Sequence, residues 1–396
     1  MSKKLLKQLY FTSVNGVKAK ALISKNIQLL ENSIKIVDRS YSFDKYKNIY
    51  IFSVGKASYL MAKECEKILK DKITDGLAIC LENKKLNYIQ TFQSSHPIVS
   101  KRSFKAANKL IEKLQSLKKS DLVIFLLSGG ASAMVEKPID GLDFNNFQKV
   151  STAVLKSGVD IKTLNLVRKS ISQIKGGKLA EYTKAKCVNL VLSDVVGNDL
   201  ATIGSGLMFN KKVQNYIVGS NKIALQKAKK IIEKKVQKAK IVTTVLNKDT
   251  SEAAKYIQET IDKYDKKFDS YALFFGGETT TEVKANGIGG RNQELALKLL
   301  INKAIKKDTT ILCAGSDGID GNSNSAGAFL DEKIYKQIQN YNLDPQEYLN
   351  SCDSNSFFKK LNYDFTIGKT GTNVMDFIYV IKNGGEWWQI FSKMVL

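Results

Sequence analysis

Short apolar segments alternate with helix-like segments along the chain, and several of the apolar segments run directly into glycine. Segments 47–55 (KNIYIFSVG), 121–130 (DLVIFLLSGG) and 271–277 (YALFFGG) have this form, and a helix-like run follows each of them. An apolar strand, a Gly-rich turn and a helix form the repeating unit of doubly wound sheets. The sequence therefore predicts an α/β protein with two α/β domains, the larger one doubly wound and Rossmann-like.

The boundary between the two domains is predicted near residue 250. A length of 396 residues is enough for two domains. A Lys-rich helical stretch at 221–240 and the helix-like run that follows it carry few turn signals, so the division is placed between 235 and 270. We expect an N-terminal domain at 1–250 and a C-terminal domain at 251–396.

The net charge of +24 is carried almost wholly by lysine. Nucleic-acid-binding proteins rely on arginine for bidentate contacts to bases and phosphates. Here lysines are spread over helix faces such as 226–240, which is typical of solvated surface. We therefore expect weak attraction to polyanions but no specific nucleic-acid partner. The arginines of the chain are Arg39, Arg102, Arg168 and Arg291.

The cellular location and the absence of a zinc site are predicted from sequence features that the chain does not have. No apolar run approaches the ~20 residues of a membrane helix, and the N-terminal residues show no signal-peptide pattern. The five cysteines are scattered without a CxxC pair, and His96 is the single histidine, which argues against a zinc site. We expect a cytoplasmic protein without a membrane partner, either a monomer or a homodimer.

Two Gly-containing turns have the composition of a phosphate site. Segment 126–134 (LLSGGASAM) offers backbone N–H groups and two hydroxyls with little bulk, which suits an oxyanion, although a tight strand–helix turn needs the same glycines. Lys56 in SVGKAS (53–58) follows a glycine and could neutralise a phosphate as a point charge. Neither a Walker A loop nor a dinucleotide fingerprint is present.

Other segments add carboxylates and cations. Asp194 and Asp199 stand in one loop after an apolar strand, where they could bind Mg²⁺ with nucleotide phosphates or cap a helix. A predicted helix within 165–180 places Arg168 beside Asn165 and Lys169, and the KGGK that follows adds two cations. The alternative for this segment is a solvated basic helix end.

The stretch 276–295 (GGETTTEVKANGIGGRNQEL) combines two Gly pairs with Arg291. A helix beginning after Gly289 and Gly290 is expected to direct its free N–H groups at an anion. The planar fork of arginine binds phosphate or carboxylate bidentately, as lysine cannot, so Arg291 is either a ligand-binding residue or half of an interdomain salt bridge. Cations, carboxylates and Gly-rich turns together suit phosphoryl transfer.

In order and spacing these motifs resemble the glycerate 2-kinases of the family whose two regions are known as DUF4147 and MOFRL, once labelled hydroxypyruvate reductases. The resemblance covers residues 19–381. It is carried by SVGKAS, SSHPIVS, LLSGGASAM, NLVRKSISQIKGGKLA, LVLSDVVGND, FFGGETTTEV, GGRNQELAL, AGSDGIDGNSNSAGA and TGTNV. It implies that ATP, with Mg²⁺, phosphorylates D-glycerate at O2 to give 2-phosphoglycerate and ADP. It also implies an active site in the cleft between two α/β domains.

The resemblance also assigns residues to the site. It points to Lys56, Asp194, Glu278, Arg291, Asp317 and Asn373. We expect catalytic roles for Lys56, Asp194, Arg291 and Asp317, and Mg²⁺ binding by Asp194 and Asp199. Contacts to substrate or nucleotide are expected from Ser128, Gly129, Gly130, Ala131, Ser132, Arg168, Gly277, Glu278, Asn292 and Asn373.

The chain departs from the family pattern at a few positions, and two other functions stay open. Asn198 stands where the family usually has a second aspartate, and Lys369 replaces a proline, so metal binding and substrate choice could differ. One alternative function is an oxidoreductase acting on hydroxypyruvate, although the dinucleotide fingerprint is missing. The other is a non-catalytic module that binds anions or nucleic acid through its net charge.

Overall fold

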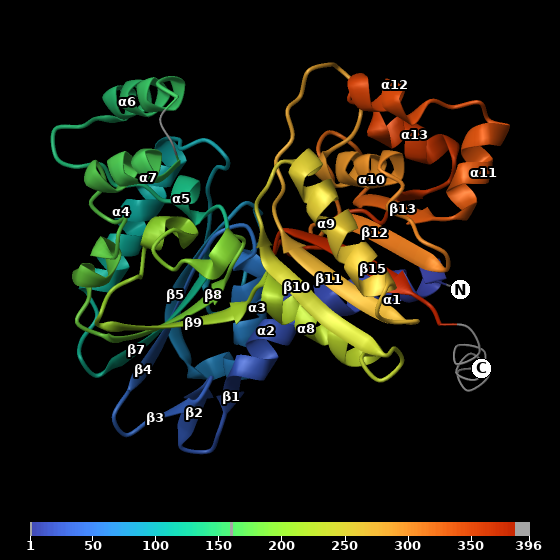
Figure 1. Cartoon of the computed structure of the whole chain (residues 1–396). Coiled ribbons are helices and arrows are strands. Elements are labelled where there is room, and N and C mark those ends of the chain that lie inside the picture. The colour runs from blue at the N-terminus through green and yellow to red at the C-terminus, as the bar shows by residue number, and fades with distance from the viewer. Residues whose placement is uncertain (1, 159–160, 385–396) are drawn as a thin grey trace. The chain divides into compact units, whose positions relative to one another are not determined.

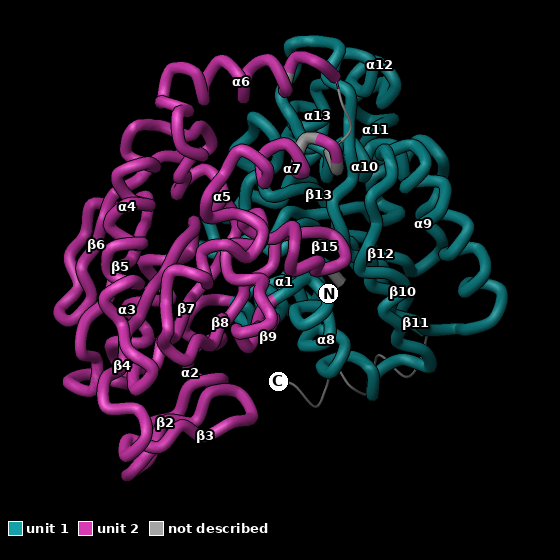
Figure 2. The backbone as a smooth tube through the Cα atoms, turned by 90° about the vertical axis from the view of Figure 1, so that its left-hand side faces the viewer, with its two compact units in different colours: residues 1–17, 220–396 teal, residues 18–219 magenta. Residues whose placement is uncertain are grey.

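The computed structural model describes residues 2–158 and 161–384, which form two compact units. Unit 2 comprises residues 18–219, and unit 1 comprises residues 1–17 together with 220–396 (Figure 2). Residues 385–396 lie outside the described part. No helix within the described residues is both long and apolar enough to cross a membrane.

Unit 2 is built on a six-stranded sheet whose neighbouring strands are all parallel. The strand order is β6-β5-β4-β7-β8-β9, so the chain winds outward first to one side of β4 and then to the other. This is the strand order of the Rossmann fold, and the direction of winding reverses between β4 and β7. The predicted doubly wound architecture is confirmed. The strands are β4 (Asn48–Val54), β5 (Ile73–Cys80), β6 (Gln90–Gln93), β7 (Asp121–Ser128), β8 (Lys186–Leu192) and β9 (Val213–Gly219).

The central strands of this sheet are buried on both faces, which explains their nearly continuous apolar sequences. Phe52 of β4 and Phe125 of β7 share one core with Leu110 of α4. A small antiparallel meander precedes the sheet, and its first strand contacts α3. The remaining elements are β1 (Ile27–Leu29), β2 (Ser33–Ile36), β3 (Arg39–Ser42), α2 (Ala19–Asn26), α3 (Ser58–Leu69), α4 (Lys101–Gln115), α5 (Ala131–Met134), α6 (Phe144–Lys156) and α7 (Ile161–Ser170), with 3₁₀ turns at Lys70–Lys72, Lys178–Tyr182, Val196–Asn198 and Ile203–Gly206.

Unit 1 contains a six-stranded mixed sheet in the order β10-β11-β15-β12-β13-β14. The last long strand, β15, runs antiparallel between β11 and β12. Its first residues therefore lie at the same edge of the sheet as the carboxyl ends of β11 and β12, and the register pairs Asp376 with both Gly277 and Gly315. The strands are β10 (Lys238–Leu246), β11 (Tyr271–Gly277), β12 (Thr309–Gly315), β13 (Gly327–Asp331), β14 (Asp364–Phe365) and β15 (Asp376–Lys382).

Helices cover both faces of this sheet (Figure 1). On one face, the ring of Phe275 meets Tyr256 of α9. On the other face, Phe274 meets Tyr379, whose hydroxyl lies 2.8 Å from Ser13 Oγ of the N-terminal helix α1. Successive residues of a strand point to opposite faces, so the two phenylalanines anchor different helix layers. The helices are α1 (Ser2–Asn15), α8 (Asn221–Ile232), α9 (Thr250–Asp265), α10 (Arg291–Ile301), α11 (Lys333–Asn340), α12 (Pro345–Asn350) and α13 (Ser354–Lys360).

The division between the compact units differs from the boundary predicted at residue 250. It falls between Gly219 and Ser220, because α8 packs on β10 and β11 and β10 is itself a strand of the second sheet. Helix α1 joins the same unit, and the hydroxyl of Tyr10 donates a hydrogen bond of 2.7 Å to the carbonyl oxygen of Gly315.

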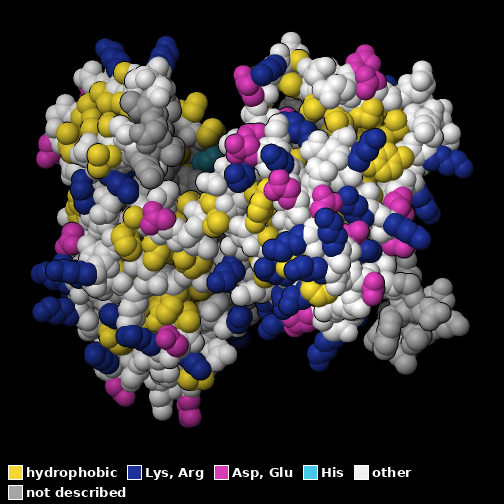
Figure 3. Space-filling view, viewed as in Figure 1, with side chains coloured by type: hydrophobic (Ala, Val, Ile, Leu, Met, Phe, Trp, Pro, Cys, Tyr) yellow, Lys and Arg dark blue, Asp and Glu magenta, His cyan; other side chains and the backbone are white. Residues whose placement is uncertain are grey.

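Basic side chains are distributed over the surface. On the face shown in Figure 3, Lys and Arg side chains are interspersed with Asp and Glu. Several lysines are paired with acidic neighbours, for example Lys212 with Glu181 at 2.5 Å. Mixed charge of this kind is consistent with solvated surface. The predicted lack of a specific nucleic-acid partner stays a prediction.

Candidate functional site

The turns after β4 and β7 are joined by hydrogen bonds at the switch point of the sheet in unit 2. The backbone N–H of Lys56 donates to the carbonyl oxygen of Gly129 at 2.9 Å, and the N–H of Ala57 donates to Ser128 Oγ at 3.1 Å. A Cβ atom on Gly55 would lie only 2.3 Å from Ser128 Oγ, so glycine is required for this approach. The structure thus brings together Lys56 and the predicted nest of Ser128 to Ser132. In open α/β sheets, ligands bind at this location.

Two further side chains lie against the nest because its glycines leave room for them. A Cβ atom on Gly129 would lie 1.7 Å from Asp194 Oδ2, and one on Gly130 would lie 2.8 Å from His96 Cδ2. Gly130 also has a φ of +82°, which a side chain would strain. Asp194, in the loop after β8, therefore lies at the same place as Lys56 and Gly130, which were also predicted site residues.

His96 is a member of this site that the sequence did not assign. It lies in the segment between β6 and α4, where the SSHPIVS motif was the available signal. Burial and the nearby Lys56 lower the pKa of His96, so the imidazole is neutral at physiological pH. A neutral imidazole can donate one hydrogen bond and accept another.

Asp199 is engaged in its own turn. Its Oδ1 accepts a hydrogen bond of 3.1 Å from the N–H of Ala201, and its Oδ2 accepts one of 2.5 Å from the hydroxyl of Thr202. These bonds close a local turn between two 3₁₀ turns and do not form a helix N-cap, because the N-cap of Ile203–Gly206 is Thr202. The metal-binding role of Asp199 stays a prediction.

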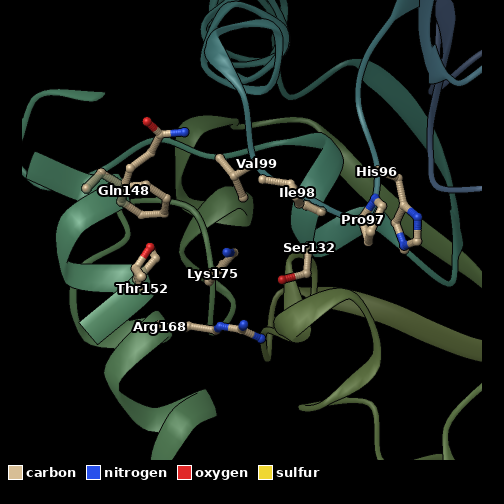
Figure 4. A pocket seen from close by; sticks show the side chains of 13 residues that line it. His96, Pro97, Ile98, Val99, Ser132, Gln148, Thr152, Arg168 and Lys175 are labelled. Atoms are coloured by element: carbon tan, nitrogen blue, oxygen red, sulfur yellow. The ribbon is translucent and has the colours of Figure 1, made fainter. Parts of the chain in front are cut away.

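A cavity of about 600 Å³ opens beside the nest within unit 2. Arg168 of α7 and Lys175 lie along one side of it, and Ile98 and Val99 lie along the opposite side (Figure 4). Gly130 and Ser132 connect the cavity to the nest. Its lining residues are His96, Pro97, Ile98, Val99, Gly130, Ser132, Ala133, Phe147, Gln148, Ser151, Thr152, Arg168 and Lys175.

The two cations of KGGK both have partners within the protein, but Lys175 is buried whereas Lys178 is exposed. Lys175 is buried and forms an ion pair with buried Glu136, whose other oxygen accepts a hydrogen bond of 2.6 Å from Ser172. Lys178 Nζ donates to the carbonyl oxygen of Lys169 at 2.9 Å, near the end of α7. α7 ends at Ser170, so the helix stops before the Gly pair.

In unit 1, the first turn of α10 follows Gly290 as predicted, but two of its N–H groups are already bound. Buried Asp320 accepts hydrogen bonds from the N–H of Asn292 at 3.0 Å and from the N–H of Gln293 at 2.8 Å. A carboxylate of the protein therefore occupies the place that we expected for a bound anion. Burial raises the pKa of Asp320 to about 6 against the opposing effect of these hydrogen bonds.

Arg291 is held by two carboxylates of its own unit. Its Nε and Nη2 donate to Asp376 at 2.6 and 3.1 Å, and its Nη1 lies 2.7 Å from Glu278 Oε1. Burial lowers the pKa of Arg291, but the pair with Asp376 raises it overall. The Asp376 side chain is only 3% exposed, and burial raises its pKa despite Arg291. Asp376 has no local signal in the sequence, because its partner Arg291 lies 85 positions away.

The other predicted residues of unit 1 gather at the same sheet edge. Asp317 follows β12 and lines a cavity of about 420 Å³ together with Arg291. Asn373 precedes β15, and its Oδ1 accepts a hydrogen bond of 2.9 Å from the N–H of Met375. Gly277 ends β11 with a φ of +148°. Asn292 is buried and donates from Nδ2 to Asp320, so its side chain has a structural partner.

The fold and the site of unit 2 are those of the α/β proteins that bind a phosphate-bearing ligand. A Rossmann-type sheet carries a glycine nest and a lysine at its switch point, which is how α/β proteins bind a phosphate-bearing ligand.

Comparison with known proteins is more specific. Residues 5–238 match the family described as "Domain of unknown function (DUF4147)", and residues 271–376 match the MOFRL family. A D-glycerate 2-kinase of Thermotoga maritima is 33% identical over 89% of this chain and 96% of its own. A glycerate 2-kinase of Pyrococcus horikoshii is 29% identical over 88% of this chain and 90% of its own. A solved glycerate kinase structure from Thermotoga maritima superimposes with a TM-score of 0.85 at 30% identity, covering 96% of this chain and 99% of that one.

The chain therefore belongs to the DUF4147 and MOFRL family, the glycerate 2-kinase family that its motifs predicted.

Proposed function

We propose that this protein transfers the terminal phosphoryl group of ATP to O2 of D-glycerate, giving 2-phosphoglycerate and ADP. The observation that carries the proposal is the junction of the Lys56 turn with the Ser128–Gly129–Gly130 turn at the switch point. Phosphoryl transfer requires mainly positioning and charge neutralisation, and this junction supplies a cation beside backbone N–H groups. The names of the relatives from Thermotoga maritima and Pyrococcus horikoshii support the choice of D-glycerate.

The proposed roles in unit 2 follow from the contacts around the nest. Lys56 neutralises the phosphate charge, and the N–H groups of Gly129 to Ala131 bind phosphate oxygens. Asp194 lies against Gly129 and is the proposed base that accepts the proton of the attacking hydroxyl. His96, neutral beside Lys56, is suited to orient the acceptor by a hydrogen bond.

Groups of unit 1 are proposed to take part as well. Arg291 has donors beyond those that Asp376 and Glu278 accept, because a guanidinium carries five N–H bonds. Asp317 is the alternative base or a ligand for the nucleotide side. Glu278, Asn373, Gly277 and Asn292 are proposed to shape the same edge of the sheet.

Mg²⁺ is the metal that the family implies. Within residues 2–158 and 161–384, no three His, Cys, Asp or Glu side chains gather so as to hold a metal by themselves. A nucleotide-bound Mg²⁺ keeps several waters and needs only one or two carboxylates, so Asp194 beside the nest fits it. Asp199 is the proposed second ligand. When bound, Mg²⁺ would neutralise charge on the phosphates.

The alternatives are less well supported. A hydroxypyruvate oxidoreductase would need a dinucleotide site, and the turn after β4 reads SVGKAS without the required glycines. A nucleic-acid-binding module would not need the buried junction of the nest. We further propose a cytoplasmic location, since four of the five free cysteines are buried thiols, and a monomer or homodimer without a nucleic-acid partner.

A steady-state assay tests the proposal. Purified protein with ATP and Mg²⁺ should release ADP only when D-glycerate is added. Parallel reactions with NADH and hydroxypyruvate should leave NADH unchanged. ADP release that ignores D-glycerate, or oxidation of NADH, would contradict the proposed function.

A further inference from the structure

Arg168 lines the cavity of unit 2 and has no carboxylate partner among residues 2–158 and 161–384. Its guanidinium points into the cavity (Figure 4), and it forms no salt bridge with any residue that the structure describes. Arg291, in contrast, is paired with both Asp376 and Glu278. An arginine in a concave site with no carboxylate partner is suited to a bidentate carboxylate or phosphate of a ligand.

The other charges of the cavity wall are already compensated. The charge of Lys175 is balanced by Glu136, with which it forms a buried pair. His96 is neutral at physiological pH because burial and Lys56 lower its pKa. Among the described residues that line the cavity, Arg168 therefore carries the one uncompensated positive charge, which favours a ligand with a single anionic group over a polyphosphate.

Ser132, the last residue of the nest, lines the cavity and is paired with a second hydroxyl. Ser132 Oγ, which lines the cavity, lies 2.8 Å from Ser205 Oγ, and either hydroxyl can be the donor. Ser205 adopts a φ of +58°, between Gly204 and Gly206, which also have positive φ values. A serine in this left-handed region is strained, and such strain persists where the side chain serves a function. The arrangement fixes Ser132 beside Gly130, where a hydroxyl of the ligand would meet the phosphate site.

The size of the cavity also bears on the ligand. About 600 Å³ is within the range of pockets for drug-sized molecules and is more than a three-carbon acid fills. Gln148 and Thr152 add polar groups farther from the nest (Figure 4). A longer polyhydroxy acid would keep its carboxylate at Arg168 and direct its chain toward them.

We infer that this cavity is the acceptor site, in which Arg168 binds the carboxylate of a 2-hydroxy acid and Ser132, positioned by Ser205, contacts its hydroxyl. The inference rests on the proposed function, of which it names the acceptor site. It also extends the substrate class to 2-hydroxy acids with four to six carbons, which should compete with D-glycerate.

Kinetic constants of matched variants test the inference. Arg168→Met should raise the KM for D-glycerate roughly 10- to 100-fold, the value of a charge-assisted hydrogen bond, and leave the KM for ATP within about twofold. Arg168→Lys should recover part of the loss. Arg102→Met, an exposed arginine on α4 outside the cavity, is the matched control and should change neither constant.

Ser205→Gly tests the positioning residue without risking the fold, because glycine adopts positive φ freely. It should raise the KM for D-glycerate and leave the melting temperature unchanged. A raised KM for ATP in Arg168→Met would make the cavity the nucleoside site and overturn the inference, as would unchanged constants.

A result that contradicts the proposed function can be distinguished from one that contradicts this inference. Wild-type protein without D-glycerate-dependent turnover would contradict the function. Calorimetric titration with D-glycerate then still tests the cavity, because binding to the wild type that is lost in Arg168→Met supports the inference. Equal binding to both proteins, or binding to neither, overturns it.

Discussion

The guanidinium of Arg291 holds the carboxylate of Asp376 by two hydrogen bonds, Nε to Oδ2 at 2.6 Å and Nη2 to Oδ1 at 3.1 Å. This pair joins the start of α10 to the start of β15, which lies between β11 and β12. Arg291 therefore stabilises the sheet edge of unit 1 in addition to its proposed contact with phosphate.

Arg291→Met should lower the free energy of unfolding by about 2–3 kcal/mol. When both partners of an ion pair are buried, removing one of them lowers the free energy of unfolding by more than this amount. The Arg291 side chain is 33% exposed, so we expect a smaller decrease here. Urea unfolding measures the change. The double variant Arg291→Met with Asp376→Asn should recover part of the stability, because it leaves no unpaired buried carboxylate. A double variant as unstable as the sum of the single ones would show that the pair is not the cause.

Lys56→Ala should reduce kcat by ~10²–10³-fold, the effect of losing one preorganised charge in an active site. Lys56 is exposed beside the nest, so stability should be unaffected. Initial rates at saturating ATP and D-glycerate measure the effect. Lys63→Ala, an exposed lysine of α3, is the control and should behave as the wild type. A near-normal kcat in Lys56→Ala would remove Lys56 from the site.

Asp194→Asn and Asp317→Asn distinguish the base from a residue that only binds. Loss of the base should lower kcat and leave the affinity for ATP and D-glycerate nearly as before. A metal ligand should instead raise the Mg²⁺ concentration needed for half-maximal rate. Asp194 lies against Gly129 and is proposed both to accept the proton and to contact Mg²⁺, so we expect a lower kcat together with a higher Mg²⁺ requirement. If Asp194→Asn retains its kcat and Asp317→Asn loses it, the assignment is reversed.

The pH dependence of stability should include a contribution from Asp320. Its pKa is about 6 in the folded protein and 3.8 as the reference value for an unfolded chain. A raised carboxyl pKa means that the folded state binds the proton more tightly, so this stabilisation is present at low pH and is lost as the pH rises through 6. The loss amounts to about 2 kcal/mol between pH 4 and 7.

Urea unfolding of the wild type and Asp320→Asn across this pH range measures that contribution. The difference in unfolding free energy between the two proteins should change with pH in the stated direction. A constant difference would mean that Asp320 is ionised throughout the range.

The sequence predicted the elements of the fold that local patterns determine. Strands such as β7 are continuous apolar runs that end at glycine, and these patterns also marked the turns of Lys56 and Ser128. The Rossmann strand order could not be predicted from them, because it depends on which strands pair.

Contacts between distant residues account for what the sequence did not predict. Tyr10 bonds to Gly315 across 305 positions, so the membership of α1 in unit 1 has no local signal. Asp320 lies 28 positions from Asn292 in the sequence, and its carboxylate accepts hydrogen bonds from the N–H groups that the sequence predicted to be free for an anion. A helix that begins after a Gly pair indicates an anion-binding site. Only the structure shows that a carboxylate of the protein itself fills this site.

The most direct test is identification of the product. Protein incubated with ATP, Mg²⁺ and D-glycerate is examined by NMR, which distinguishes the phosphoglycerate isomers. We predict 2-phosphoglycerate, formed in equal amount to ADP. Formation of 3-phosphoglycerate, or of no phosphoglycerate at all, would contradict the account.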